Sequence, residues 1–345
     1  NIRAGRILQS AGLPLSPSAP NHARNGLLAL FVGLVLGIGV AFFRDRLDER
    51  VRGREELEFH AAAPVLGFIP RVYSKNKEVP FTLSEPKSEA AEAFRSLGVR
   101  LLHAINQRAR TVVITSSSAG EGKTLVAANL GVTIALTGRR AVIVSADLRR
   151  PRLQSYFRGS DFGVTGGAGL TEVLQGTRKP MEALSRSETK NLWIVHAGGR
   201  AETLGRWDLL GSRSMIDLLA QLREFADVVL IDTPPLLETS DVLALAPLSD
   251  GVVLVVDPRH ADRSNVEQAR HELDLMGVPV IGVVVNKHDP RRFRAYGSGY
   301  RDYGNGYVRS TGEASPATLR AIPDDGEYQT TITPSDRDAG NQISP

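Results

Sequence analysis

A glycine-rich segment with an adjoining lysine and threonine is the part of the sequence best suited to chemistry. It follows an apolar run at 111–115 and precedes a stretch with helical character. Glycines let the backbone approach phosphate oxygens closely, and the N–H groups at the start of a helix attract an anion. A lysine in such a loop contacts the β- and γ-phosphates, and the threonine hydroxyl binds Mg²⁺. The candidate ATP- and phosphate-binding residues are Ser118, Ala119, Gly120, Glu121, Gly122, Lys123, Thr124 and Leu125.

The segment is a P-loop with one departure, because Ser117 occupies the position of its first glycine. Two further apolar runs end in aspartate. Asp147 follows the run at 141–145, and Asp232 follows the run at 227–231 in the position of a Walker B aspartate. Carboxylates at the ends of parallel strands lie where such sheets bind ligands. We therefore expect Asp232 to hold Mg²⁺ directly or through water, although either aspartate alone could simply cap a helix.

The order GEGKT, ADLRRP and LIDTPP resembles the cytoplasmic domain of bacterial tyrosine kinases, with their Walker A, Walker A′ and Walker B motifs. This resemblance implies ATP and Mg²⁺ as cofactors, Lys123, Asp147 and Asp232 as catalytic residues, and Thr124, Asp147 and Asp232 as metal ligands. Asp147 would orient or deprotonate the incoming tyrosine hydroxyl. The implied activity is transfer of phosphate from ATP to tyrosines on the tails of neighbouring copies in a ring.

Two segments near the N-terminus extend the resemblance. Residues 14–43 are similar to the Pro-rich stretch and second transmembrane helix of polysaccharide co-polymerase (chain-length determinant) modules, and residues 64–70 to the segment that follows them. The resemblance implies a role in capsular or exopolysaccharide biosynthesis, chain length and export. It also implies polymerase or export machinery and a tyrosine phosphatase as partners. An extracytoplasmic domain and a first transmembrane helix would precede the sequence in such proteins.

The C-terminal segment is rich in tyrosine and glycine. Four of the seven tyrosines lie within twelve residues, and four glycines separate them. Glycine permits many backbone conformations, so the segment is suited to enter another subunit's site. A low-complexity tail without phosphoryl chemistry is the alternative. The predicted autophosphorylation sites are Tyr296, Tyr300, Tyr303 and Tyr307.

Two positions depart from the bacterial tyrosine kinase pattern. The first aspartate of Walker A′ is replaced by Ser145, which supplies neither negative charge nor a carboxylate base. Weak activity, or a nucleotide-binding scaffold without catalysis, therefore stays open. The Glu-x-x-Arg-x-x-Arg pattern of the oligomerisation helix is matched by Glu92 and Arg95 but then meets Gly98. The pair predicts ring formation, and an ordinary surface ion pair is the alternative.

Two other nucleotide-binding classes compete with this interpretation. The segment Asn286-Lys287-His288-Asp289 matches the NKxD motif of GTPases, but Thr233-Pro234-Pro235 lacks the glycine of a GTPase switch. We therefore expect Asn286 to contact adenine. A partition-type P-loop ATPase would carry a second lysine at position 118, where this chain has serine.

The apolar runs that carry these motifs predict the fold class. Short Val- and Ile-rich runs at 111–115, 141–145, 192–196, 227–231, 251–256 and 280–285 alternate with helical stretches. This alternation is typical of an α/β fold with a doubly wound, mainly parallel sheet. We expect a P-loop kinase domain at 85–290, a linker at 44–84 with a short strand or turn near 61–70, a helix at 88–106 and a flexible tail at 291–345.

The N-terminal part contains a candidate membrane span. Residues 26–43 form an uncharged apolar stretch, long enough as a helix to approach the thickness of a bilayer core. Five arginines follow it and three precede it, so the positive-inside rule places the kinase domain in the cytoplasm. We predict an extracytoplasmic Pro-rich segment at 1–24, a transmembrane helix at 25–43 and location in the cell (inner or plasma) membrane.

Composition excludes several other classes. The formal net charge is +4, too small to indicate a nucleic acid partner. The chain has no cysteine, which excludes disulfides, thiolate metal sites and cysteine nucleophiles. Hydrophobic residues at 42% are enough to form a core.

Overall fold

The computed structural model describes residues 21–46, 50–51, 53–72, 79–105, 110–157, 167–199 and 206–289. The four tyrosines predicted as phosphorylation sites lie outside these residues, as does the Pro-rich segment at the N-terminus.

The described residues form an eight-stranded sheet in the order β1-β8-β7-β2-β6-β3-β5-β4. Every neighbouring pair is parallel except β4 and β5, which are antiparallel. The six strands expected from the apolar runs are all present, so the mainly parallel sheet is confirmed. The strands are β1 (Val65–Pro70), β2 (Thr111–Ser116), β3 (Ala141–Ser145), β4 (Leu184–Arg186), β5 (Leu192–Val195), β6 (Val228–Asp232), β7 (Gly251–Val256) and β8 (Val280–His288).

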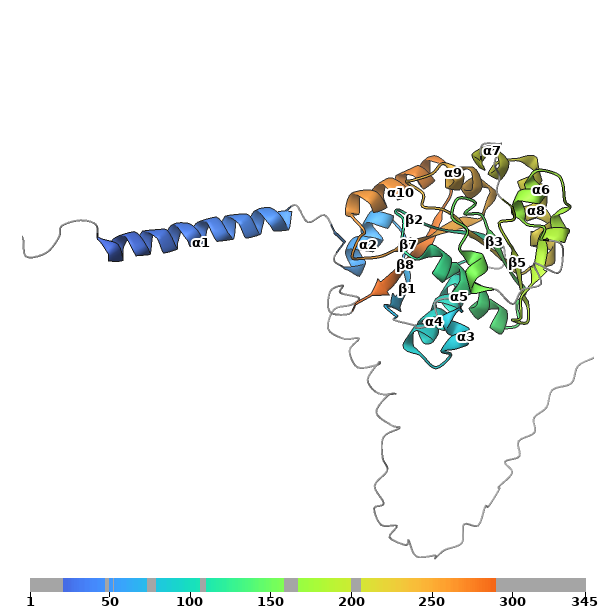
Figure 1. Ribbon diagram of the computed structural model, residues 1–345, viewed down its shortest axis with the longest axis horizontal. Coiled ribbons are helices and arrows are strands. Elements are labelled where there is room, and N and C mark those ends of the chain that lie inside the picture. Colours follow the sequence, from blue (N-terminus) through green and yellow to red (C-terminus); the bar gives the residue numbers. More distant parts are fainter. Residues whose placement is uncertain are drawn as a thin grey trace, which may run out of the picture. The chain divides into compact units, whose positions relative to one another are not determined.

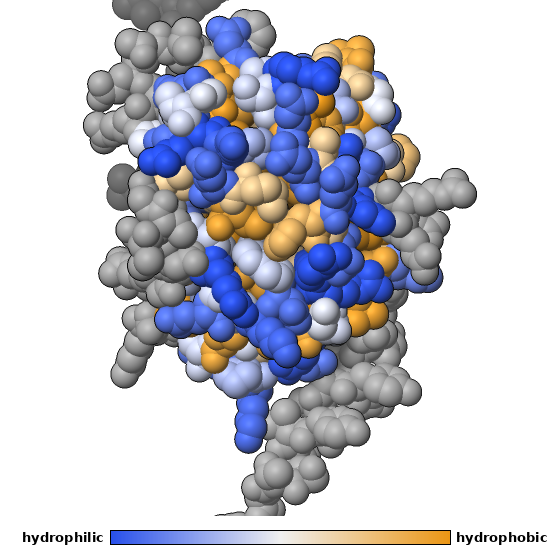
Figure 2. Space-filling model, turned by 90° about the vertical axis from the view of Figure 1, so that its right-hand side faces the viewer, coloured by the Kyte–Doolittle hydropathy of each residue, from blue (hydrophilic) through white to orange (hydrophobic). Residues whose placement is uncertain are grey.

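Helices cover both faces of this sheet, as Figure 1 shows. One face packs against α3 (Phe81–Ser84), α4 (Glu89–Ala104) and α5 (Lys123–Leu136). The other packs against six helices, namely α2 (Arg54–Ala61), α6 (Leu170–Leu174), α7 (Arg206–Leu210), α8 (Arg213–Phe225), α9 (Asp241–Leu245) and α10 (Arg263–Leu275). Both faces are therefore buried, which explains the continuous apolar character of the central strands. One side of the molecule shows mostly hydrophilic residues around smaller apolar groups (Figure 2).

The boundary expected near residue 85 is wrong, because part of the expected linker belongs to the domain. Strand β1 pairs in parallel with β8 at one edge of the sheet. Leu57, Val65 and Ile69 are buried in the two cores. The charged composition around residues 44–58 concealed this role, since α2 buries only one face. The segment after the apolar helix therefore forms an edge of the sheet.

The apolar N-terminal stretch forms helix α1 (His22–Arg46), which extends a few residues beyond the expected 25–43 at each end. Residues 22–44 are long and apolar enough to cross a membrane, and their large apolar side chains are exposed. At 1.5 Å per residue these 23 residues measure about 35 Å, slightly more than a hydrocarbon core of about 30 Å.

Candidate active site

Three neighbouring central strands bring the sequence motifs together at their carboxyl-terminal ends. Strand β2 lies beside β6, and β6 lies beside β3. Asp232 at the end of β6 is in register with Ile114 on β2 and with Ser145 on β3. The backbone N–H of Ala146 donates to the carbonyl of Asp232 at 2.8 Å. The P-loop after β2, the Walker B aspartate and the Walker A′ segment therefore meet at the crevice where doubly wound sheets bind ligands.

The P-loop needs glycine at two positions. Gly120 and Gly122 have φ angles of +82° and +99°, in the left-handed region where other residues are strained. Gly122 is also the N-cap of α5, so the loop leads directly into a helix N-terminus with free N–H groups. Lys123, the first residue of α5, is only 8% exposed. The local sequence thus produces two left-handed glycines and a helix start, the conformation expected of a P-loop, while its binding of phosphate stays a prediction.

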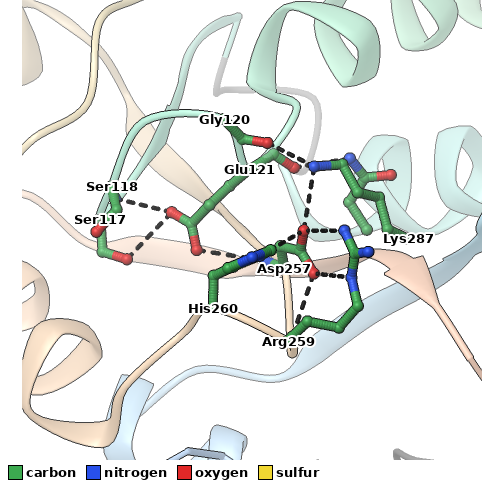
Figure 3. A network of polar contacts seen from close by, with 9 residues as sticks. Ser117, Ser118, Gly120, Glu121, Asp257, Arg259, His260 and Lys287 are labelled. Carbon is green, nitrogen blue, oxygen red and sulfur yellow. Dashed lines mark hydrogen bonds and ion pairs between the residues drawn. The ribbon is translucent and has the colours of Figure 1, made fainter.

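Glu121, expected to contribute to phosphate binding through its backbone, places its side chain behind the loop. One carboxylate oxygen accepts hydrogen bonds from the Ser118 N–H at 2.8 Å and from the Ser117 hydroxyl at 3.1 Å. The other accepts from the Asp257 N–H at 3.3 Å. Burial raises the pKa of Glu121, although these hydrogen bonds oppose the shift. The serine at the first glycine position therefore joins an internal brace of the P-loop (Figure 3).

Two residues at the end of β8, Asn286 and Lys287, also hold the P-loop, and of these Asn286 was expected to contact adenine. The Asn286 side-chain amide donates to the Glu121 carbonyl at 2.7 Å, and Asn286 is 1% exposed. The Lys287 ammonium donates to the Gly120 carbonyl at 2.6 Å and to the Asp257 carboxylate at 3.0 Å. Both side chains therefore hold the P-loop by donating hydrogen bonds to its backbone carbonyls. The adenine contact of Asn286 stays a prediction.

Asp257, at the end of β7, is the centre of this network (Figure 3). Its carboxylate accepts two hydrogen bonds from the Arg259 guanidinium, at 2.7 and 3.0 Å, and one nitrogen of His260 lies 3.2 Å away. Burial alone would raise the pKa of Asp257, but the contacts of Arg259 and Lys287 hold it well below its usual range. Asp257 therefore stays ionised and fixes Lys287 against the P-loop.

The environment of Asp232 differs from that of Asp257. It is fully buried, and neither carboxylate oxygen makes a hydrogen bond of ordinary geometry with the described residues. Burial raises the pKa of Asp232 to about 7, Lys123 and Thr124 oppose the rise, and the negative charge of Asp147 adds to it. The buried Ser145 hydroxyl next to it also lacks a partner among the described residues. A buried carboxyl group left without donors is suited to a cation.

Asp147 lies on a loop that is held at two points. One oxygen of Asp147 accepts from the Arg150 N–H at 2.9 Å, and Asp147 is 7% exposed. Arg149 donates to both oxygens of the buried Asp241, on α9, at 3.0 and 3.1 Å. This two-bond contact and the charges of Asp241 and Asp147 raise the pKa of Arg149. Neither Arg149 nor Asp241 was predicted from sequence.

These residues fit Mg²⁺ held jointly by protein and nucleotide. The described residues contain no group of three or more His, Asp or Glu side chains that could hold a metal alone. Mg²⁺ commonly uses one or two protein oxygens and completes its shell with phosphates and water. The unpartnered Asp232 carboxyl and the Thr124 hydroxyl supply such oxygens beside Lys123.

The predicted oligomerisation residues lie on the exposed side of α4. Arg95 donates to Glu92 at 2.8 Å and to the Pro86 carbonyl at 2.9 Å. Gly98 is buried instead, and a Cβ there would lie 2.8 Å from Cγ2 of Thr133 on α5. Close packing of α4 on α5 thus accounts for glycine at the third position of the pattern. Ring formation stays a prediction.

Replacing Gly122 with Ala should greatly weaken nucleotide binding. The alanine would occupy a left-handed backbone position, and its Cβ would lie 2.0 Å from the Asn286 side-chain nitrogen. We expect at least a tenfold loss of affinity for Mg-ATP, measured by titration calorimetry. Gly138→Ala is the matched control, since Gly138 has a φ of +90° but open space around it. Equal affinities of the Gly122 variant and the unmodified protein would contradict this loop geometry.

Comparison with known proteins identifies a nucleotide-binding family and several individual relatives. Residues 112–310 match the family model described as CobQ/CobB/MinD/ParA nucleotide binding domain. The chain is 28% identical over 294 residues to the tyrosine-protein kinase ptk of Acinetobacter johnsonii, covering 81% of this chain and 39% of that protein. It is 26% identical over 346 residues to the succinoglycan biosynthesis transport protein ExoP of Rhizobium meliloti, covering 90% and 43%.

Among solved structures, the kinase domain of the Escherichia coli tyrosine kinase ETK aligns with a TM-score of 0.62 and 24% identity, covering 72% of this chain and all of that one. At this identity the likeness establishes the fold. The chain spans about two-fifths of the length of the curated relatives that it matches first.

Proposed function

We propose a function from the premise that this chain belongs to the CobQ/CobB/MinD/ParA nucleotide binding domain family, whose model it matches over more than half of its length. The chain is a membrane-anchored protein-tyrosine autokinase that uses Mg-ATP. It acts in the biosynthesis, chain length control and export of a capsular or exopolysaccharide. Relatives named as tyrosine-protein kinases and as a succinoglycan biosynthesis transport protein support this proposal.

The observation that carries the proposal is the convergence of four side chains at neighbouring strand ends. Lys123 and Thr124 begin α5, Asp232 is the last residue of β6, and Asp147 follows the end of β3. Lys123 and the loop N–H groups bind the phosphates, while Thr124 and Asp232 hold Mg²⁺, which neutralises the charge that develops on the phosphoryl group.

Asp147 orients the incoming tyrosine hydroxyl and accepts its proton. The hydroxyl oxygen then bonds to the γ-phosphorus as the bond to the bridging oxygen of ADP breaks. Because the transferred group passes through a loose transition state, catalysis rests on positioning and charge more than on covalent chemistry. An exposed carboxylate would serve less well here, since the low exposure of Asp147 keeps its interactions strong.

The acceptors are Tyr296, Tyr300, Tyr303 and Tyr307, phosphorylated on neighbouring copies in a ring to which Glu92 and Arg95 contribute. Helix α1 crosses the cell (inner or plasma) membrane, and the kinase domain lies in the cytoplasm. Its partners are the polysaccharide polymerase or export machinery and a tyrosine phosphatase that removes the phosphates. The excess of arginines after the apolar stretch at 26–43 supports this orientation.

A mixing experiment tests transfer between copies. A Lys123→Met chain with intact tyrosines is incubated in membranes with an active chain whose four tail tyrosines are changed to Phe, and Mg-ATP is added. Phosphate on the Lys123→Met chain, detected by intact mass and peptide mapping, is the expected result. A mixture that binds ATP but labels neither chain would overturn the autokinase proposal.

The alternative is a nucleotide-binding scaffold of polysaccharide assembly with little catalysis, which Ser145 in place of an aspartate favours. A partition-type P-loop ATPase is a further alternative, although Ser118 replaces its second lysine.

The substitution Ser145→Asp distinguishes weak catalysis from none. Ser145 is 1% exposed and directly in register with Asp232, so a carboxylate there strengthens binding of Mg²⁺ or assists the proton transfer. We expect phosphorylation at least tenfold faster, measured as initial rates with saturating Mg-ATP, since general-base assistance is typically worth about 10²–10⁴-fold. Ser145→Asn, which adds bulk without charge, should not accelerate the reaction. The scaffold becomes the better account if neither the unmodified nor the Ser145→Asp protein labels any tyrosine.

A further inference from the structure

Lys287, near the end of β8, has an unusual backbone conformation. Its φ angle is +55°, in the left-handed region that residues other than glycine rarely adopt. Here Phe68 pairs with Val285 and Pro70 with His288, so two steps along β1 face three along β8. The extra residue of β8 makes a β-bulge, an irregularity that can turn a side chain away from its regular direction.

The bulge allows two consecutive side chains to reach the same loop. In a regular strand, neighbouring side chains point to opposite faces of the sheet. At the end of β8, however, Asn286 donates to the Glu121 carbonyl at 2.7 Å. Lys287 donates to the Gly120 carbonyl at 2.6 Å, and Figure 3 shows its side chain directed at the P-loop and at Asp257. A strained backbone position therefore coincides with a side chain that holds the loop.

These two hydrogen bonds determine which way the N–H groups of the P-loop point. In a planar trans peptide, a carbonyl and the N–H of the next residue point in opposite directions. The Gly120 and Glu121 carbonyls both point to the end of β8, so the N–H groups of Glu121 and Gly122 point away from it. Successive N–H groups on one side of a turn form an anion-binding concavity. The end of β8 therefore orients donors suited to phosphate.

Asp257 restricts the movement of the Lys287 side chain. Its carboxylate is 3.0 Å from the Lys287 ammonium and is almost fully buried, and the Arg259 guanidinium binds it from another direction. A lysine side chain is flexible, and fixing it costs conformational entropy. The contact with Asp257 meets this cost in the free protein, so the loop is already arranged when a ligand arrives.

We infer that Lys287 is a positioning residue for phosphate: through the Gly120 carbonyl it turns the Glu121 N–H toward the anion, while Asn286 does the same for the Gly122 N–H. The inference rests on the phosphate binding proposed for the P-loop and not on transfer to tyrosine. Because peptide N–H groups contact the phosphates and not the base, the effect of Lys287 is independent of the nucleoside.

Calorimetric titration of the full chain in lipid tests this role. Lys287→Met should weaken the binding of Mg-ATP and of inorganic tripolyphosphate with Mg²⁺ by the same factor, about tenfold, since the donors are no longer held before binding. The factor should persist in about 0.5 M salt, which screens a distant charge far more than a hydrogen bond within the loop. Lys287→Arg keeps a charged donor and should retain more affinity. Lys190→Met, the matched control at an exposed lysine, should leave both affinities unchanged.

The substitution Lys287→Gly separates positioning from stability. Glycine adopts the left-handed conformation without strain, so this variant should unfold at a higher temperature than Lys287→Met. It lacks the same donor, however, and should bind both ligands as weakly as Lys287→Met does.

The outcomes separate this inference from the proposed function. Affinity that follows stability across these variants, or a loss confined to ATP, would overturn the inference and leave the assignment of the P-loop intact. An unmodified chain that binds neither ligand would overturn the inference and the proposed function together. Affinities that behave as expected in a chain that labels no tyrosine would contradict the kinase proposal alone.

Discussion

Replacing Lys123 with Met should lower the rate of tyrosine phosphorylation by about 10²–10³-fold, the usual effect of removing one donor that stabilises transition-state charge. Lys123 begins α5 at the P-loop, is almost fully buried, and favours the charged form of Asp232. Methionine has a similar length, so the fold should persist while the positive charge at the phosphates is lost. Initial rates of phosphotyrosine formation at saturating Mg-ATP provide the measurement.

Lys190→Met is the matched control for this change. Lys190 is exposed and precedes β5, so it lies at the amino-terminal ends of the parallel strands, whereas the P-loop lies at their carboxyl-terminal ends. The same substitution there should therefore alter the rate less than twofold. Unfolding curves of both variants would show whether either has lost its fold. A Lys123→Met protein that folds and phosphorylates at the unmodified rate would refute the assignment of the phosphate site.

Replacing Asp232 with Asn should stabilise the nucleotide-free protein and abolish tight binding of Mg-ATP. The buried carboxyl group of Asp232 has its pKa raised to about 7 from 3.8, mainly by burial. A charge without donors in the interior is costly, and a neutral amide of the same shape removes that cost. Without the carboxylate, Mg²⁺ loses its buried protein ligand. We expect affinity for Mg-ATP to fall at least thirtyfold at pH 8.

The raised pKa of Asp232 determines how the stability of the protein changes with pH. Between pH 4 and pH 7 the folded state keeps the proton on Asp232 while the unfolded state releases it. The contribution of Asp232 to the free energy of unfolding therefore falls as pH rises through this window, by about 4 kcal/mol at most, and is constant above it. The stability advantage of Asp232→Asn should grow from pH 4 to pH 7. Affinity of the unmodified protein for Mg-ATP should increase from pH 6 to pH 8 as the carboxylate forms.

Thermal unfolding and calorimetric titration at several pH values test these two trends. Asp227→Asn is the matched control, because Asp227 is exposed at the other end of the same strand. Its stability difference from the unmodified protein should not follow the same pH window. An Asp232→Asn protein less stable than the unmodified one at pH 8 would show that the carboxyl group has stabilising partners in the free protein.

Much of the site could be predicted from sequence because the signals are local. Gly120 and Gly122 determine the loop conformation through their own backbone freedom, and Lys123 and Thr124 follow them along one chain segment. Asp232 and Asp147 end apolar runs. Because the carboxyl-terminal ends of neighbouring parallel strands lie on the same side of a sheet, the two residues were expected to lie close together. The family pattern and the strand order therefore agree without knowledge of side-chain contacts.

Sequence pattern did not predict the contacts that side chains make with segments distant in sequence. Glu121 has the appearance of an exposed residue between two glycines, yet its carboxylate is buried and bound to Ser118 and Asp257. Only the pairing of β2 with β7 brings Glu121 and Asp257 together, because these two residues are 136 positions apart in sequence. The pairing of Arg149 with Asp241 is hidden for the same reason.

The sequence by itself determined the conformation of the P-loop, the α/β class and the apolar helix, since each depends on residue type and spacing within short segments. Tertiary structure decided the raised pKa of Asp232, the support of the P-loop by Asn286 and Lys287, and the place of β1 in the sheet. Burial shifts the pKa of a carboxyl group only when distant segments exclude water from it. Likewise, β1 becomes a strand of the domain because β8 presents a free edge and both faces beside it are covered.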